Sequence, residues 1–173
     1  GSGLHLPHSV GSLGPCASFA AVIRLSRTLH FNAGRSLWRK GWSEEKNRAV
    51  YGEEGPHGYG HNYALEVSVE GSIDPESSMV VNLGDLDRVL REEVDVPLDH
   101  KNLNRDVPDF ADVPPTAENL AAWIWRRLAA RIEREGWPCR LAHLRLRLNP
   151  GFAVEIESPH PNPLPPGEGT RLR

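Results

Sequence analysis

The sequence has little of what would place it in a specialised class of protein. It contains only two cysteines, Cys16 and Cys139, which lie in different settings and predict neither a disulfide framework nor a cysteine metal site. It has no excess of positive charge, because 20 lysines and arginines stand against 23 aspartates and glutamates. It also has no apolar run long enough to span a membrane. These absences argue against nucleic-acid and membrane partners, and they favour a cytoplasmic protein.

The two ends of the 173-residue chain lack the periodic apolar residues that build a core. Residues 1–19 are rich in glycine, serine and proline, and residues 158–173 contain five prolines. We expect both ends to be disordered. The residues between them, 20–157, are predicted to form a single domain.

Within this domain the apolar residues follow two periods. Alternation predicts strands, and a spacing of three or four residues predicts helices. The predicted strands cover residues 21–31, 61–70, 143–148 and 154–157, and a predicted helix covers residues 83–94. Residues 39–48 are charged and without a clear period, so we expect a loop with at most a short helical turn. Pro97 is expected to end the first helix, and a second helix should begin at a Thr116 cap and end at Gly136.

Four short motifs follow one another along the domain. They are FNAGRSLW at 31–38, GYGHNY at 58–63, LDHKNLN at 98–104 and PTAEN at 115–119. Together they resemble the 6-pyruvoyl-tetrahydropterin synthase and 6-carboxytetrahydropterin synthase family, over roughly residues 22–157. The resemblance implies an α+β tunnelling fold (T-fold), in which a four-stranded antiparallel sheet carries two helices on one face in the order ββααββ. Exposed sheet edges in that fold imply a homo-oligomer, a trimer or a hexamer.

The resemblance also implies a catalytic zinc ion held by three histidines. Their positions hold Arg35, Tyr59 and His61 in this sequence. A guanidinium has no lone pair to give, and a tyrosine would bind zinc only as a phenolate, so His61 is the only retained ligand. An alternative set would combine His57, His61 and His30, although His30 has the opposite strand parity and His57 lies in a turn.

Three further residues match the proton-transfer groups of the family. Glu54, or its neighbour Glu53, falls where the family has a cysteine or a glutamate in the turn before GYGHNY. A carboxylate there is a candidate general base, and a solvated acidic turn is the alternative. Asp99 and His100 match the aspartate and histidine of the family's proton relay, and a purely structural hydrogen-bonding role is their alternative. Glu54 and Asp99 are also candidate partners for the charge of Arg35.

The ligand pocket implied by the resemblance is altered as well. The family's glutamate–threonine pair, which holds the pterin ring, corresponds to Leu148 and Asn149. Thr116 and Glu118 match other substrate-binding positions, although helix capping would explain both. Arg35 is a candidate for binding an anionic substrate group or for replacing zinc electrostatically, and a side chain that points into solvent is the alternative.

The leading hypothesis is therefore a member of this family whose zinc-dependent lyase chemistry on dihydroneopterin triphosphate is impaired or altered. One alternative is an active 6-carboxytetrahydropterin synthase with a remodelled site, in the branch that the resemblance connects with queuosine biosynthesis. Another is a non-catalytic protein that binds a pterin or a purine-like molecule. A third is a structural subunit that co-assembles with a paralogue.

Overall fold

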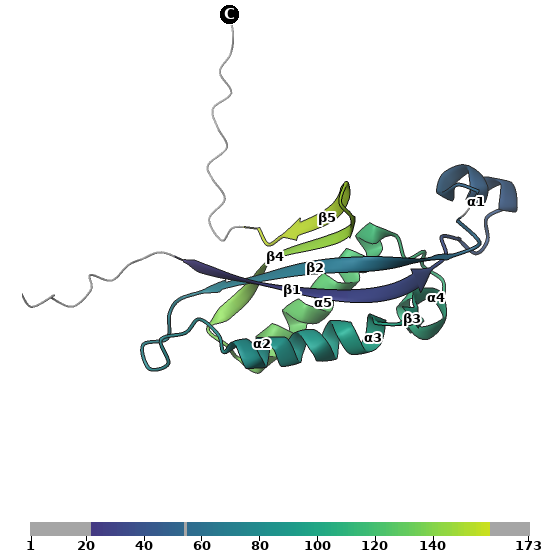
Figure 1. Ribbon diagram of the computed structural model, residues 1–173. Coiled ribbons are helices and arrows are strands. Elements are labelled where there is room, and N and C mark those ends of the chain that lie inside the picture. The colour runs from purple at the N-terminus through teal and green to yellow at the C-terminus, as the bar shows by residue number, and fades with distance from the viewer. Residues whose placement is uncertain (1–21, 54, 160–173) are drawn as a thin grey trace, which may run out of the picture.

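The computed structural model describes residues 22–53 and 55–159, and these residues form one sheet with helices packed against one face (Figure 1). The five strands are β1 (Ile23–Arg35), β2 (Tyr59–Gly71), β3 (Lys101–Asn102), β4 (Cys139–Asn149) and β5 (Phe152–Glu157). Their spatial order is β3-β1-β2-β4-β5. All neighbours among the four long strands are antiparallel, as the sequence predicts, and the α+β class is confirmed.

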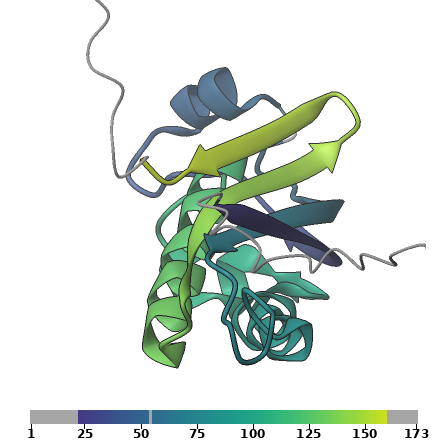
Figure 2. The ribbon, with the colours of Figure 1, turned by 90° about the vertical axis from the view of Figure 1, so that its left-hand side faces the viewer.

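Helices and irregular turns connect the strands. They are α1 (Glu44–Tyr51), α2 (Leu83–Leu90), the π-helical turn η1 (Arg91–Asp95), α3 (Val96–Leu98), α4 (Leu103–Asp106), the 3-10 turn η2 (Pro108–Phe110) and α5 (Ala117–Glu135). In two views at right angles, α2 and α5 lie on the same side of the sheet (Figure 1 and Figure 2). None of the helices in the described ranges is long and apolar enough to cross a membrane.

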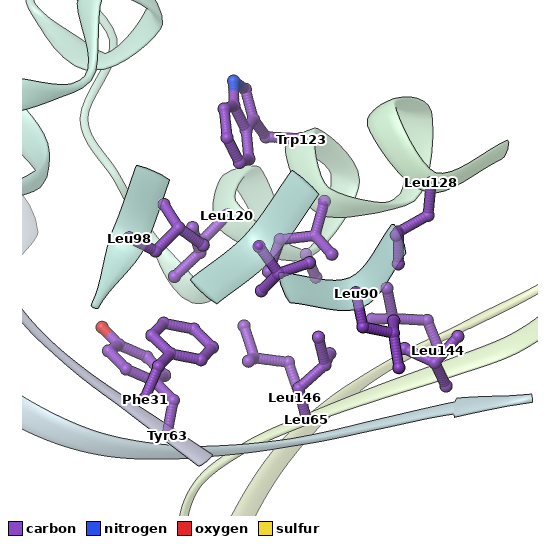
Figure 3. Close-up of a cluster of buried hydrophobic side chains, with 14 of the residues drawn as sticks. Phe31, Tyr63, Leu65, Leu90, Leu98, Leu120, Trp123, Leu128, Leu144 and Leu146 are labelled. Atoms are coloured by element: carbon purple, nitrogen blue, oxygen red, sulfur yellow. The ribbon is translucent and has the colours of Figure 1, made fainter. Parts of the chain in front are cut away.

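The core lies between the sheet and these helices. Figure 3 shows Phe31, Tyr63, Leu65, Leu144 and Leu146 rising from the strands toward side chains of α2, α3 and α5. Every one of these five side chains is at most 1% exposed. Alternation along β1, β2 and β4 turns these residues to one face, so the period-two pattern accounts for the sheet side of the core.

The prediction of exactly four strands is wrong, because residues Lys101–Asn102 pair in parallel with the end of β1. The cause is a sharp reversal of the chain after α3. His100 has a φ of 56°, and its N–H donates a hydrogen bond of 2.6 Å to the carbonyl oxygen of Asn32. This contact lays the two following residues against the free edge of β1.

The prediction that Pro97 ends the first helix is also wrong. Helical backbone continues from α2 through η1 into α3, and Asp99 is the first residue with extended geometry. Proline lacks an N–H, and its ring collides with the preceding turn of an ordinary α-helix. The π-helical turn η1 ends at Asp95, so Pro97 lies in the first turn of the α3 segment that follows, where a proline is tolerated.

The charged segment before β2 forms a helix, α1, that extends beyond the expected helical turn. The Ser43 side chain accepts a hydrogen bond from the N–H of Lys46 and caps its first turn. Asn47 is fully buried, where its side chain accepts a bond from the N–H of Arg39 and donates to the Arg39 carbonyl oxygen. Polar contacts therefore hold α1 in place, which explains why apolar periodicity does not reveal it.

The predicted ends of the domain and the cysteine prediction are covered only in part. Residues 1–21 and 160–173 lie outside the described residues, so the predicted disorder of 1–19 stays a prediction. Cys139, on β4, is a free thiol among the described residues, whereas Cys16 lies outside them, so the cysteine prediction stays a prediction.

Candidate functional site

Arg35 is the last residue of β1, and its side chain is buried. Pairing of β1 with β2 continues as far as Arg35 opposite Tyr59, which turns Arg35 to the helix side of the sheet. Only 6% of the residue is exposed. Its Nη1 donates a hydrogen bond of 2.7 Å to the carbonyl oxygen of Pro115, just before α5. The alternative in which Arg35 points into solvent is therefore wrong.

Three rings on β2 share this face with Arg35. The ring centroids of Tyr59 and His61 are 5.3 Å apart, and those of His61 and Tyr63 are 5.6 Å apart. The small residue Ala33 stands directly opposite His61, so the diagonal between Arg35 and His61 is within reach of a long side chain. We call Arg35, Tyr59, His61 and Tyr63 the Arg35 cluster.

The electrostatics of the cluster follow from its burial. The pKa of His61 is lowered, first because burial disfavours the imidazolium and second because the charge of Arg35 repels it. Burial raises the pKa of Tyr63, with Arg35 acting weakly in the opposite direction. At neutral pH, His61 is therefore uncharged and Tyr63 keeps its proton. Arg35 supplies the positive charge of the cluster.

Three polar atoms of this cluster are buried without a hydrogen-bond partner among the described residues. They are Nε of Arg35, Nδ1 of His61 and the hydroxyl oxygen of Tyr63. Buried polar groups in native proteins are nearly always paired, and each unpaired group costs about 1–3 kcal/mol. The cluster therefore has hydrogen-bonding capacity that the described part of the chain does not use.

Asp99 and His100 form a second polar unit beside the end of β1. The Asp99 Oδ1 accepts a hydrogen bond of 2.8 Å from the N–H of Asn32, and its Oδ2 lies 2.6 Å from Nδ1 of His100. Both contacts lower the pKa of Asp99, with the Asn32 N–H as the larger cause. An ionised carboxylate only accepts, so Nδ1 of His100 carries the proton and Nε2 is left as an acceptor. The predicted pairing of Asp99 with Arg35 is not found.

An open hollow of about 450 Å³ lies beside His100, and His61 is the one residue of the Arg35 cluster in its lining. Its lining includes His61, Asn62, His100 and Lys101, together with Gly34 and Gly60. The His100 side chain is 77% exposed, so its free Nε2 is accessible. The backbone of His100 has a positive φ, which is uncommon for a residue with a side chain, and such backbone strain often occurs at functional sites. His61 and His100 thus both line this hollow, whereas Arg35, Tyr59 and Tyr63 do not.

The other predicted site residues do not line this hollow. Glu54 lies outside the described residues, and the carboxylate of Glu53 accepts a hydrogen bond from Arg48 of α1. His57 is exposed in the turn before β2. His30 lines a separate hollow with Glu66 on the opposite face of the sheet. The alternative metal set of His57, His61 and His30 is therefore wrong, because strand parity separates His30 from His61.

Thr116 and Glu118 stand at the start of α5. The Thr116 hydroxyl accepts a hydrogen bond of 3.2 Å from the N–H of Asn119, and Glu118 is exposed in the first turn. These contacts are those of a helix cap. The neighbouring Pro115 nevertheless binds Arg35, so the PTAEN segment contacts the cluster through its backbone.

Comparison with known proteins identifies the family of this chain. A family model described as 6-pyruvoyl tetrahydropterin synthase matches residues 24–159. The chain belongs to the 6-pyruvoyl tetrahydropterin synthase family. A 6-pyruvoyl tetrahydrobiopterin synthase of Poecilia reticulata is 49% identical over 106 residues, which are 61% of this chain and 72% of the relative. A dihydroneopterin monophosphate aldolase of Pyrococcus furiosus is 35% identical over 109 residues, which are 63% of this chain and 86% of the relative.

Solved structures agree with this family assignment. The 6-pyruvoyl tetrahydropterin synthase of Caenorhabditis elegans superposes with a TM-score of 0.72 and 26% identity, covering 80% of this chain and 96% of that chain. An uncharacterised protein of Wolinella succinogenes has a TM-score of 0.57 at 17% identity, over 80% of this chain and 99% of that chain, and shows the fold alone.

The zinc ion that membership of this family implies does not fit the Arg35 cluster. A buried guanidinium offers no lone pair and would repel a divalent cation beside it. His61 alone supplies one ligand, whereas a catalytic zinc needs three. Across the described residues, no group of three or more histidine, cysteine, aspartate or glutamate side chains is arranged to hold a metal.

Two contributors to this family site were missed by sequence reasoning. Tyr63 has the alternation of a core residue, and its stacking on Phe31 at 4.8 Å confirms that role, but its hydroxyl is also buried without a hydrogen-bond partner among the described residues. The carbonyl oxygen of Pro115 carries no side-chain signal at all. Tyr59, His61 and Tyr63 alternate along β2 and so share one face of the sheet, and this alternation was the sequence signal that could have indicated Tyr63.

Proposed function

We propose that this protein binds a pterin, or a similar purine-like ring, and that its zinc-dependent lyase step is lost or altered relative to its family. The buried Arg35 carries this proposal, because the family resemblance puts it where a zinc-binding histidine is expected. A guanidinium supplies a fixed positive charge. It forms no coordination bond, and it does not activate a bound water as zinc does.

The printed names of the relatives support a pterin as the ligand. The Poecilia reticulata relative is named for the synthesis of a 6-pyruvoyl tetrahydrobiopterin, and the Pyrococcus furiosus relative is named for an aldolase reaction of dihydroneopterin monophosphate. These two names describe different reactions on related ring systems. A family scaffold that serves more than one reaction is consistent with an altered reaction in this chain.

The Asp99–His100 pair favours a site with altered chemistry over a site that has lost its chemistry. Asp99 orients His100 and fixes its proton on Nδ1, so Nε2 is available to accept a proton from a ligand in the hollow. Arg35 would hold negative charge on the helix side of the sheet. The chain thus keeps acid–base chemistry while it replaces the metal with an organic cation.

The sheet edges support assembly into a homo-oligomer, a trimer or a hexamer, with a paralogue as a further possible partner. β3 and β5 are the outer strands. β5 presents six residues along an edge, and natural proteins cover such edges by pairing or by other devices. An oligomer would therefore place residues of a second subunit beside each sheet edge.

Metal content and ligand binding test the proposal together. Protein purified without chelator should contain well below one zinc ion per chain by mass spectrometry. A pterin present at 100 times its dissociation constant should stabilise the fold by about 2.7 kcal/mol, which raises Tm by about 5–10 °C for a chain of this size. Tripolyphosphate serves as the control ligand, because it carries charge without the ring.

The same protein should be assayed with 7,8-dihydroneopterin triphosphate, with and without added zinc. We expect no zinc-dependent turnover. Tightly held, stoichiometric zinc with zinc-dependent turnover would instead establish the active synthase with a remodelled site. Absence of stabilisation by any pterin would reject ligand binding and leave the structural subunit.

A further inference from the structure

The helical backbone that leads to Asp99 contains one wide turn. Helix α2 continues through the π-helical turn η1 into α3, and the N–H of Val96 donates to the carbonyl oxygen of Arg91, five residues earlier (Figure 1). The last hydrogen bond of this backbone runs from the N–H of Asp99 to the carbonyl oxygen of Asp95, at 2.8 Å. The geometry of the wide turn therefore sets the direction in which Asp99 leaves the helix.

The spacing of the buried apolar residues shows what this turn does. They recur every four residues, and each is at most 4% exposed: Leu86, Leu90, Val94 and Leu98. An α-helix has 3.6 residues per turn, so three steps of four residues would rotate the last side chain by about 120° from the first. A π-helical turn takes up one additional residue, or about 100°. The turn thus returns Leu98 to the core, and it directs the next residue, Asp99, to the end of β1.

Pro97 removes one hydrogen bond from this backbone. A proline has no N–H, so the carbonyl oxygen of Glu93, four residues earlier, loses the partner that an α-helix would give it. Nε of Arg127, on α5, donates to this oxygen at 3.3 Å. A side chain of α5 therefore replaces the backbone donor that is missing beside the wide turn.

The same arginine also pairs with the carboxylate of Glu93. This is the only buried carboxylate among the described residues, and its side chain is 10% exposed. Its Oε2 lies 2.6 Å from Nη2 of Arg127, and its Oε1 lies 3.2 Å from Nη1 of Arg131. A buried charge that loses its partner is strongly destabilising, so these contacts hold η1 in one arrangement against α5. We call Glu93 and Arg127 the Glu93 clamp.

From these contacts we infer that Glu93 and Arg127 are positioning residues for the Asp99–His100 pair. The clamp keeps the wide turn in the geometry that brings Asp99 to the N–H of Asn32 and Nδ1 of His100. Without the clamp, the turn can relax toward an ordinary α-helix, which rotates Asp99 away from both partners. The inference rests on the proposed function only for the acid–base role of His100, and it adds two residues that act on this role from a distance.

Proton–nitrogen correlation NMR of the histidine rings in the full, ligand-free chain tests the inference. At about pH 8, where histidine rings are mostly neutral, His100 of the unmodified protein should carry its proton on Nδ1; its signals are those absent from His100→Gln. Glu93→Ala should reduce the Nδ1–H form of His100 to a minority. Glu92→Ala is the matched control, because Glu92 lies in the same turn but pairs with Arg131 at 2.9 Å, and this variant should keep the Nδ1–H form.

Each outcome decides a different point. A folded Glu93→Ala that keeps the Nδ1–H form would overturn the inference, because the buried apolar spacing alone would then position the pair. If Glu93→Ala does not fold, Arg127→Met decides, since Arg131 still pairs with the carboxylate in that variant. A reduced Nδ1–H form in Arg127→Met supports the inference, and an unchanged one overturns it.

The measurement needs no ligand, so it separates the inference from the proposed function. A protein that binds no pterin but loses the Nδ1–H form in Glu93→Ala would reject the proposed function and support the positioning role. Absence of the Nδ1–H form from the unmodified protein would overturn the pairing of Asp99 with His100, and with it the positioning role.

Discussion

Combining Arg35→His with Tyr59→His should give this protein a zinc site. Positions 35 and 59 are directly opposite in the β1–β2 register, and His61 lies two residues farther along the same face. Directly opposed side chains have Cβ atoms about 4.5–5.5 Å apart, and diagonal neighbours are within reach of long side chains. Three imidazoles projecting from these positions can therefore meet one ion at Zn–N distances of about 2.0–2.1 Å.

The structure also sets the size of the effect. Loss of the hydrogen bond from Arg35 to Pro115 should cost about 1.5–3 kcal/mol, and removal of the buried, unpaired Nε should return about 1–3 kcal/mol, so the metal-free double variant should melt close to the unmodified protein. Zinc at 100 times its dissociation constant should return about 2.7 kcal/mol. This corresponds to an increase in Tm of about 5–10 °C for a chain of this size.

Isothermal titration measures the affinity for zinc, and melting curves at several zinc concentrations measure the change in Tm without and with the metal. Each single substitution is a control, because it leaves fewer than three histidines on this face. The double variant should bind one zinc ion per chain, and the single variants should bind far more weakly. A folded double variant that fails to bind zinc would refute the inferred geometry. Tight stoichiometric zinc in the unmodified protein would refute the assignment of Arg35 to the metal position.

The other predictions concern acid stability, the core, the assembly and the ends of the chain. The lowered pKa of Asp99 contributes stability that is present above its unfolded pKa of about 3.9 and is lost as the pH falls through its folded pKa; Asp99→Asn should therefore reduce Tm at pH 7 and flatten its dependence on pH below about 4. Leu144→Ala, at a fully buried position, should lower the free energy of unfolding by about 2–5 kcal/mol in urea titrations. Light scattering at micromolar concentration should give a trimer or hexamer, and a monomer would contradict the argument from exposed edges. Removal of residues 1–19 and 158–173 should leave the melting temperature nearly unchanged, since neither segment has a periodic apolar face.

The long elements of the fold could be predicted because each buries one apolar face. Alternation indicates the strands, and the stripe from Leu120 to Ile132 indicates α5, whose cap at Thr116 and αL end at Gly136 are where the sequence puts them. Elements held by polar contacts could not be predicted in this way. The bonds of Asn47 hold α1, and the reversal at His100 creates β3.

The candidate site could be predicted only to the level of strand parity. Strand parity puts His61 on the helix-facing side of the sheet, and the sequence motifs indicate Asp99 and His100 as site residues. Neither signal reveals that Asp99 binds the backbone of Asn32. Parity also does not say how deeply Arg35 is buried. That depends on the carbonyl of Pro115, which is 80 residues away in the chain. Tertiary contacts of backbone groups leave no pattern in a single sequence.

The burial of Arg35 bears on whether the site has decayed or changed. Removing a guanidinium from water is costly, and a long arginine at the end of a strand can readily extend its charge into solvent instead. Here the side chain is 6% exposed, and its Nη1 is held by Pro115 while its Nε has no described partner. Decay alone gives no physical reason to keep a charge in such a place. A compensating group that reaches the cluster, from a ligand or from a neighbouring subunit, does give one, so the arrangement favours a changed site.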